Sequence, residues 1–200
     1  MKNMSDLYAP SFDYPTEDKN TGEKLKTHII DFIQSVVVIG AIFALIYLFV
    51  AQPHKVSGNS MIPTFHNGDY ILTDKLTYRI RSPQRGDVIV LKNPRNENQD
   101  FIKRIIALPG ETVSIKEDSV YINGLQMQEL YLPAETLTSA GNFLQEDEEI
   151  KIGPNQLVVF GDNRSGSSDS REWGPITKEE IVGRVIFRYF PLNVFGLIRN

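Results

Sequence analysis

The chain has 200 residues, no cysteine and a formal net charge of −4 at pH 7. The absence of cysteine excludes disulfides, thiolate nucleophiles and cysteine metal sites. The acidic balance argues against a nucleic-acid partner, because a nucleic-acid-binding domain carries a basic footprint. The three histidines, His28, His54 and His66, are not spaced as a ligand pair on one helix face, so we expect no metal site and no cofactor.

The N-terminal region combines a polar segment with an apolar one. Residues 1–28 mix lysines with carboxylates and contain few periodic apolar residues, a composition that predicts a mobile tail. Residues 29–51 form the only long apolar run, and 32–52 carries no charge, which is enough to span a bilayer as a helix. A cleaved signal peptide is the main alternative, but Phe49-Val50-Ala51 lacks the small residue expected two positions before Ala51. A buried core helix seldom runs this long without a polar face, so we expect an uncleaved transmembrane anchor.

The orientation of this anchor follows from its flanking lysines. Lys19, Lys24 and Lys26 precede the span, whereas Lys55 alone follows it closely. Because cytoplasmic flanks carry the excess of positive charge, we expect a single-pass protein of the cytoplasmic (plasma) membrane. Its N-terminal tail lies in the cytoplasm and residues 52–200 lie outside.

Residues 52–200 have a sequence pattern that is typical of a β-rich domain. Short apolar segments alternate with turn signals, and helical periodicity is poor apart from one turn at 177–181. Asn123-Gly124, between two apolar runs, is a strong signal for a tight hairpin. We expect a mainly β fold with an inserted region over about 111–155 that is irregular from residue 125. The predicted strands are 69–73, 87–91, 101–108, 112–115, 119–122, 156–160 and 182–189.

Ser60 is the first candidate for chemistry. It lies in the stretch Ser57-Gly58-Asn59-Ser60-Met61-Ile62-Pro63-Thr64, where Gly58 and Asn59 tolerate a positive φ and Pro63 fixes the backbone just beyond. A serine presented on such a turn can act as a nucleophile, although serine in such loops is commonly a plain turn residue. The nearby His54 and His66 are one option for its base.

Lys103 is the other option for the base. In the segment Phe101-Ile102-Lys103-Arg104-Ile105-Ile106, strand alternation places Lys103 on the face of Phe101 and Ile105, with Arg104 on the opposite face. If the first face is buried, desolvation lowers the lysine pKa from about 10.4 toward the value of about 7–8 that suits a general base near neutral pH. The alternative is a lysine on an edge strand whose amine reaches solvent.

The stretch from Gly161 to Pro175 is dense in hydroxyls, carboxylates and arginines. Either Asp162 or Asp169 can pair with Arg164 or Arg171 in a bidentate fork that fixes the loop. A solvated polar loop is the alternative. The hydroxyls that could steer a lysine amine are those of Ser165, Ser167, Ser168 and Ser170.

Four segments together resemble the bacterial type I signal peptidases, also called leader peptidases. They are 57–64, 85–90, 101–111 and 161–174. The resemblance extends from the apolar run to about Tyr189. It implies a membrane-anchored, β-rich serine endopeptidase that removes signal peptides from exported preproteins, cleaving after small residues through an acyl-enzyme.

The resemblance also implies roles for individual residues. Ser60 matches the nucleophile of the Ser/Lys dyad, Lys103 its general base, and Ser167 the serine that orients the lysine amine. The positions that match loop-shaping residues are Asp162, Asp169 and Arg171. The chain departs from some members at Gly58, where they have a serine that donates to the oxyanion. We expect the Ser60 N–H and a second donor instead, with the Gly58 N–H preferred over Ser57.

The expected partners are signal peptides and the lipid bilayer. Residues 61–63 and 190–198 are candidates for lipid contact, with ordinary core packing as the alternative. Three rival interpretations stay open: a self-cleaving Ser/Lys protease of the repressor type, an inactive membrane-anchored binding domain, and a peptidase with one dedicated substrate. The repressor type would carry a DNA-binding helical segment in place of residues 29–51.

Overall fold

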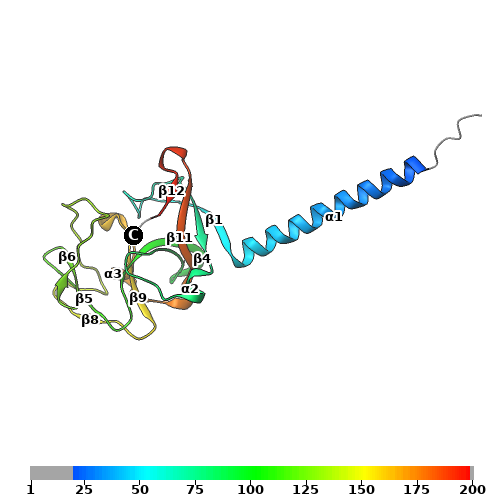
Figure 1. The fold of residues 1–200 in the computed structure, drawn as a ribbon. Coiled ribbons are helices and arrows are strands. Elements are labelled where there is room, and N and C mark those ends of the chain that lie inside the picture. The colour runs from blue at the N-terminus through cyan, green and yellow to red at the C-terminus, as the bar shows by residue number, and fades with distance from the viewer. Residues whose placement is uncertain (1–19, 199–200) are drawn as a thin grey trace, which may run out of the picture. The chain divides into compact units, whose positions relative to one another are not determined.

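The computed structural model describes residues 20–198, so the part of the predicted tail at 1–19 lies outside the described residues. The chain divides into two units, and the boundary falls between residues 44 and 45. The first unit is part of the long helix α1 (Asn20–Phe49). The second holds the strands (Figure 1).

Helix α1 includes most of the predicted anchor at 29–51 and begins before it, at Asn20. Residues 20–28 continue the helix toward the N-terminus, and Thr27 Oγ1 donates to the carbonyl of Glu23. Extending an existing helix needs no new nucleation, so a polar segment with the helix formers Glu23, Lys24, Leu25 and Lys26 can join it. Gly22–Phe49 is long and apolar enough to cross a membrane, and its apolar window is not buried by the described chain.

Two antiparallel sheets make up the second unit. The larger has the strand order β1-β2-β11-β3-β4-β9-β10, with β12 beside β11, and the smaller has the order β7-β6-β5-β8. Figure 1 shows β5, β6 and β8 gathered at one side of the domain. The strands of the larger sheet are β1 (Ala51–Lys55), β2 (Tyr70–Asp74), β3 (Val88–Asn93), β4 (Asn96–Ala107), β9 (Gln156–Phe160), β10 (Ile176–Thr177), β11 (Ile181–Phe190) and β12 (Gly196–Leu197). Those of the smaller are β5 (Thr112–Lys116), β6 (Ser119–Ile122), β7 (Leu125–Gln126) and β8 (Ile150–Lys151).

The mainly β prediction is confirmed, and each of the seven predicted strands is present. The Asn123-Gly124 turn joins β6 to β7 with both residues at positive φ. The four strands of the smaller sheet all come from the region that we predicted as inserted. The remaining elements are short: α2 (Thr77–Ile80), α3 (Ser170–Trp173), and the 3₁₀ turns η1 (Arg164–Gly166), η2 (Lys178–Glu180) and η3 (Leu192–Val194).

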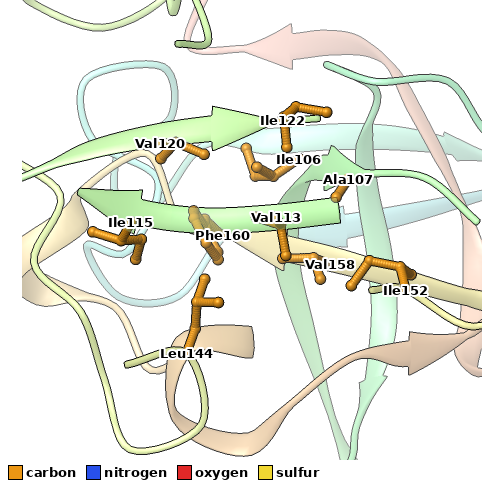
Figure 2. Close-up of a cluster of buried hydrophobic side chains, with 10 residues drawn as sticks. All are labelled: Ile106, Ala107, Val113, Ile115, Val120, Ile122, Leu144, Ile152, Val158 and Phe160. Carbon is orange, nitrogen blue, oxygen red and sulfur yellow. The ribbon is translucent and has the colours of Figure 1, made fainter. Parts of the chain in front are cut away.

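From Lys103 to Ala107, strand β4 is buried on both faces, and this positions the site. Ile105 packs into one hydrophobic cluster and Ile106 into another. The second cluster brings the two sheets together (Figure 2). Because neither face is free, a charged side chain on this strand either finds a partner or loses solvent. The members of the cluster in Figure 2 are Ile106, Ala107, Val113, Ile115, Val120, Ile122, Leu144, Ile152, Val158 and Phe160.

Candidate active site

Ser60 and Lys103 meet in the structure. Ser60 lies on the turn between β1 and β2, and Lys103 lies on β4, 43 residues further along the chain. Lys103 Nζ is 3.0 Å from Ser60 Oγ, which is hydrogen-bond distance. This contact is the geometry expected of a nucleophile and its base.

The Lys103 amine is removed from water. The residue is 3% exposed, and Nζ lies 5.1 Å from the centre of the Phe101 ring. Burial lowers the pKa of Lys103 from its ordinary value of 10.5 to about 8; Arg171 lowers it further, while Asp169 and Asp162 oppose the shift. A substantial fraction of the amine is therefore neutral slightly above neutral pH and able to accept a proton.

The loop that follows β9 holds the Ser60 turn in place. The Asn163 N–H donates to the Ser60 carbonyl at 2.9 Å, and the Asn163 side chain donates to the Asn59 carbonyl at 3.1 Å. Gly161 packs so closely that a methyl group there would clash with the Ser60 carbonyl oxygen and with Ser167 Oγ. Sequence reasoning did not identify Asn163, because a loop asparagine carries no signal of its partner.

Three of the charged residues predicted to fix this loop pair with one another or with β4. Asp169 and Arg171 form the expected bidentate pair, at 2.8 and 2.9 Å. Asp162 pairs instead with Arg104 of β4, at 2.9 and 2.7 Å, and also accepts from Thr64 Oγ1 at 2.5 Å. Since Thr64 ends the Ser60 stretch, Asp162 connects this stretch to the strand that carries Lys103.

Arg164 has a partner that the sequence did not reveal. Its guanidinium forms an ion pair with Glu129, and the Tyr131 hydroxyl donates to the same carboxylate. The Tyr131 ring lies 3.9 Å from the guanidinium carbon of Arg104. A buried arginine requires a carboxylate, but the region 125–155 offers several of them, and composition could not select Glu129.

Gly58 and Ser167 differ from their expected roles. Gly58 has φ +93, and its N–H donates to Asn67 Oδ1 at 3.1 Å. That N–H is therefore engaged in the turn, which argues against it as the second oxyanion donor; Ser57, the other candidate, lines the cleft described below. Ser167 Oγ is buried and has no hydrogen-bond partner within residues 20–198, so the expected bond to the Lys103 amine is not formed.

A cleft of about 390 Å³ opens beside Ser60 and Lys103. One wall comes from residues 54–60 and the other from residues 99–103 of β4. Strand β9 pairs with β4 only from Arg104 onward, so none of the described strands covers the second edge of residues 99–103. In the described part of the chain, no cluster of three or more potential metal-ligating side chains occurs.

Comparisons with known proteins agree on one family. The family model described as "Signal peptidase, peptidase S26" matches residues 29–190. The chain is 32% identical over 182 residues to signal peptidase IB of Staphylococcus aureus, covering 86% of this chain and 94% of that protein. It is 36% identical over 158 residues to probable signal peptidase I-2 of Synechocystis, covering 76% and 69%.

Among solved structures, a signal peptidase I from Enterococcus faecalis is 30% identical, with a TM-score of 0.42, and covers 52% of this chain and 97% of that one. The residues matched by the family model include the apolar helix, the Ser60 turn, β4 and the loop after β9. The chain therefore belongs to the S26 family of signal peptidases, serine peptidases that remove signal peptides.

Proposed function

We propose that this protein is a membrane-anchored endopeptidase that cleaves signal peptides from exported preproteins after small residues, using Ser60 and Lys103 as its catalytic dyad. The observation that carries this proposal is the 3.0 Å contact between Lys103 Nζ and Ser60 Oγ, together with the burial of the amine. Family membership supplies the substrate class.

The chemistry follows from the neutral amine. Lys103 accepts the Ser60 proton as Ser60 Oγ attacks the scissile carbonyl, and the resulting tetrahedral intermediate collapses to an acyl-enzyme. The amine of the mature protein leaves with the proton from Lys103. Lys103 then deprotonates a water that attacks the ester and releases the signal peptide. The loop-shaping residues Asp162, Asp169 and Arg171 keep the two reactive groups at bonding distance.

Substrate binding uses the uncovered edge of β4. An extended peptide can add to residues 99–103 as a further strand, so that main-chain hydrogen bonds supply affinity and the cleft receives alternate side chains. Three buried apolar residues line the cleft, two of them on strands of the larger sheet and one directly after β1. Buried apolar walls that cannot move aside favour small side chains by excluding larger ones. The three residues are Val56, Ile71 and Val90.

The anchor and one surface of the domain suit a bilayer. We assign α1 as a membrane span with its N-terminal end in the cytoplasm, from its apolar composition and its flanking lysines. The apolar tip (Phe190, Leu192, Val194, Phe195 and Leu197) is exposed, and an exposed apolar patch is typical of contact with a membrane or a partner. By contrast, Met61 of the segment 61–63 is 1% exposed and belongs to the core.

Cleavage of a purified preprotein with an Ala-x-Ala site tests the proposal. The full chain in detergent should give a mature product whose N-terminus follows that site, as read by mass spectrometry. Ser60→Ala and Lys103→Ala should give no product. Lys116→Ala, which removes an exposed lysine of β5 paired with Glu149, is the matched control and should cleave normally.

The possible outcomes separate the rival interpretations. Cleavage that persists in Lys103→Ala would discard the lysine base and point to His54 or His66. A folded wild type that cleaves no general preprotein would favour a dedicated substrate or a binding role.

A further inference from the structure

The cleft beside Ser60 changes character along its length. One part of its lining is apolar, but another part is polar and consists of His54, Gln99 and Asp100, here called the polar end. Asp100 precedes Lys103 by three residues on β4, and a strand rises about 3.3 Å per residue. The backbone of Asp100 therefore lies roughly 10 Å along the strand from that of Lys103, and both residues line the cleft.

His54 is held at one ring nitrogen and unpaired at the other. Nδ1 is 3.1 Å from Oγ1 of the buried Thr73. Nε2 is buried without a hydrogen-bond partner in the described part of the chain. The Asp100 carboxylate is its ion-pair neighbour, at 3.8 Å from Nε2 to Oδ2, which is too long for a hydrogen bond.

Asp100 faces the cleft as a hydrogen-bond acceptor. Oδ1 accepts from Lys92 Nζ at 2.7 Å, while Oδ2 is the oxygen nearer to His54. The Asp100 side chain is 28% exposed. A substrate side chain with a hydroxyl could therefore donate to this carboxylate from within the cleft.

Burial favours the neutral form of His54. It lowers the pKa of His54 below its ordinary value of 6.5; Asp100 and a backbone hydrogen bond with Gln52 oppose the shift, while Lys75 and Lys92 add to it. On its own strand, Lys55 lies over the Tyr70 ring. When acid protonates His54, its Nε2–H becomes a charged donor that faces Asp100 Oδ2.

Building on the proposed function, we propose that Asp100 is a specificity-determining residue that accepts a hydrogen bond from a hydroxyl-bearing substrate side chain, and that protonation of His54 withdraws this acceptor. In an extended substrate, side chains two residues apart point the same way and lie about 7 Å apart. If the residue before the scissile bond is next to Ser60, the side chain two positions upstream faces the polar end. Serine at that position then gains an interaction that alanine cannot make.

An internal competition tests this proposal. The full chain in detergent receives equal amounts of two preproteins that differ only by serine or alanine two positions upstream of the cleavage residue. The ratio of their kcat/KM values is read from product masses between pH 5 and pH 8. Titration of Lys103 changes both rates alike and so cancels in this ratio.

The expected result is a serine preference of about fivefold at pH 8, the size of one hydrogen bond to a carboxylate in a solvated cleft, which falls toward one below pH 6.5. Asp100→Asn should abolish most of the preference at every pH. His54→Gln, which cannot titrate, should keep a preference that no longer changes with pH. Circular dichroism confirms that the variants fold, and Lys116→Ala should match the wild type.

Other results would overturn the proposal. A ratio near one in the wild type at pH 8, or an unchanged ratio in Asp100→Asn, would refute the acceptor role. A pH step that survives in His54→Gln would refute the control by His54. A wild type that cleaves neither preprotein would instead overturn the proposed function, and this inference with it.

Discussion

Lys103 and Arg104 show how adjacent residues of one strand acquire different properties. Arg104 is 1% exposed and forms a bidentate pair with Asp162. Lys103 is almost as buried, but its hydrogen-bond partner is the Ser60 hydroxyl. A cation with a carboxylate partner keeps its charge, whereas one that faces a neutral hydroxyl in a desolvated site tends to lose its proton.

The first prediction at this scale concerns pH. Only the neutral amine can accept the Ser60 proton, and the pKa of Lys103 is lowered to about 8. We expect kcat/KM to rise about tenfold per pH unit below pH 8 and to level off above it. A pH–rate profile with an Ala-x-Ala preprotein measures this rise. A midpoint below pH 6.5 would indicate a histidine base.

A second prediction concerns the cost of the buried amine. Folding lowers the pKa of Lys103 from 10.5 to about 8, so the neutral form is the one that the folded state favours. The resulting destabilisation is complete below pH 8 and fades as the pH rises to 10.5. Lys103→Met should therefore raise the free energy of unfolding at pH 7 by roughly 3 kcal/mol, at 1.36 kcal/mol per pKa unit. Urea denaturation measures this free energy of unfolding. An unchanged stability would show that the Lys103 amine stays hydrated in the folded state.

At the scale of elements, the inserted region stabilises the loop that follows β9, through the ion pair between Glu129 and Arg164. Arg164 is 3% exposed, so Glu129→Gln leaves a buried charge without its partner and should cost about 3–5 kcal/mol of unfolding free energy. Arg164→Met added to this variant should recover part of the loss. Glu149→Gln, in the exposed pair with Lys116, should change little. Equal effects of the two single variants would contradict the role of Glu129.

Gly161 provides a prediction about the contact between the loop and the Ser60 turn. Gly161→Ala would push against the Ser60 carbonyl and Ser167, and displacement of the nucleophile should lower kcat about 10²-fold. Gly196→Ala is the matched control, because a Cβ there meets nothing within 4 Å. Wild-type turnover by Gly161→Ala would show that the loop can shift without disturbing Ser60.

Local pattern predicted the elements better than it predicted the contacts between them. Turn signals and apolar runs were enough for the seven strands, but β1 is short and contains Pro53, and the first half of β4 is polar, so neither had an apolar pattern. Motif spacing indicated Ser60 and Lys103. The pairing of Asp162 with Arg104 and of Arg164 with Glu129 depends on how distant segments pack. A local sequence pattern does not predict such packing.

At the scale of the whole molecule, the apolar tip should meet lipid. Because the chain lacks cysteine, single cysteines can carry an environment-sensitive dye in the reconstituted full chain. We expect Phe195→Cys and Leu197→Cys to be quenched by lipid-borne quenchers, since apolar surface leaves water for the acyl region. Leu130→Cys, at a residue 91% exposed on the inserted region, is the control. Equal quenching at Leu130 and Phe195 would contradict a specific membrane face.

The short connection between α1 and β1 has a kinetic consequence. Val50 is the one residue between these elements, and residues 51–59 separate it from Ser60. Fully extended, this connection reaches about 30 Å. With α1 in the bilayer, as proposed, the enzyme and a preprotein in the same bilayer would search for each other within a thin layer. Such confinement raises their effective concentration without any new contact. The rate of cleavage in the cell then depends on the surface densities of the two proteins. A KM measured in detergent will be higher than the apparent KM in a shared membrane.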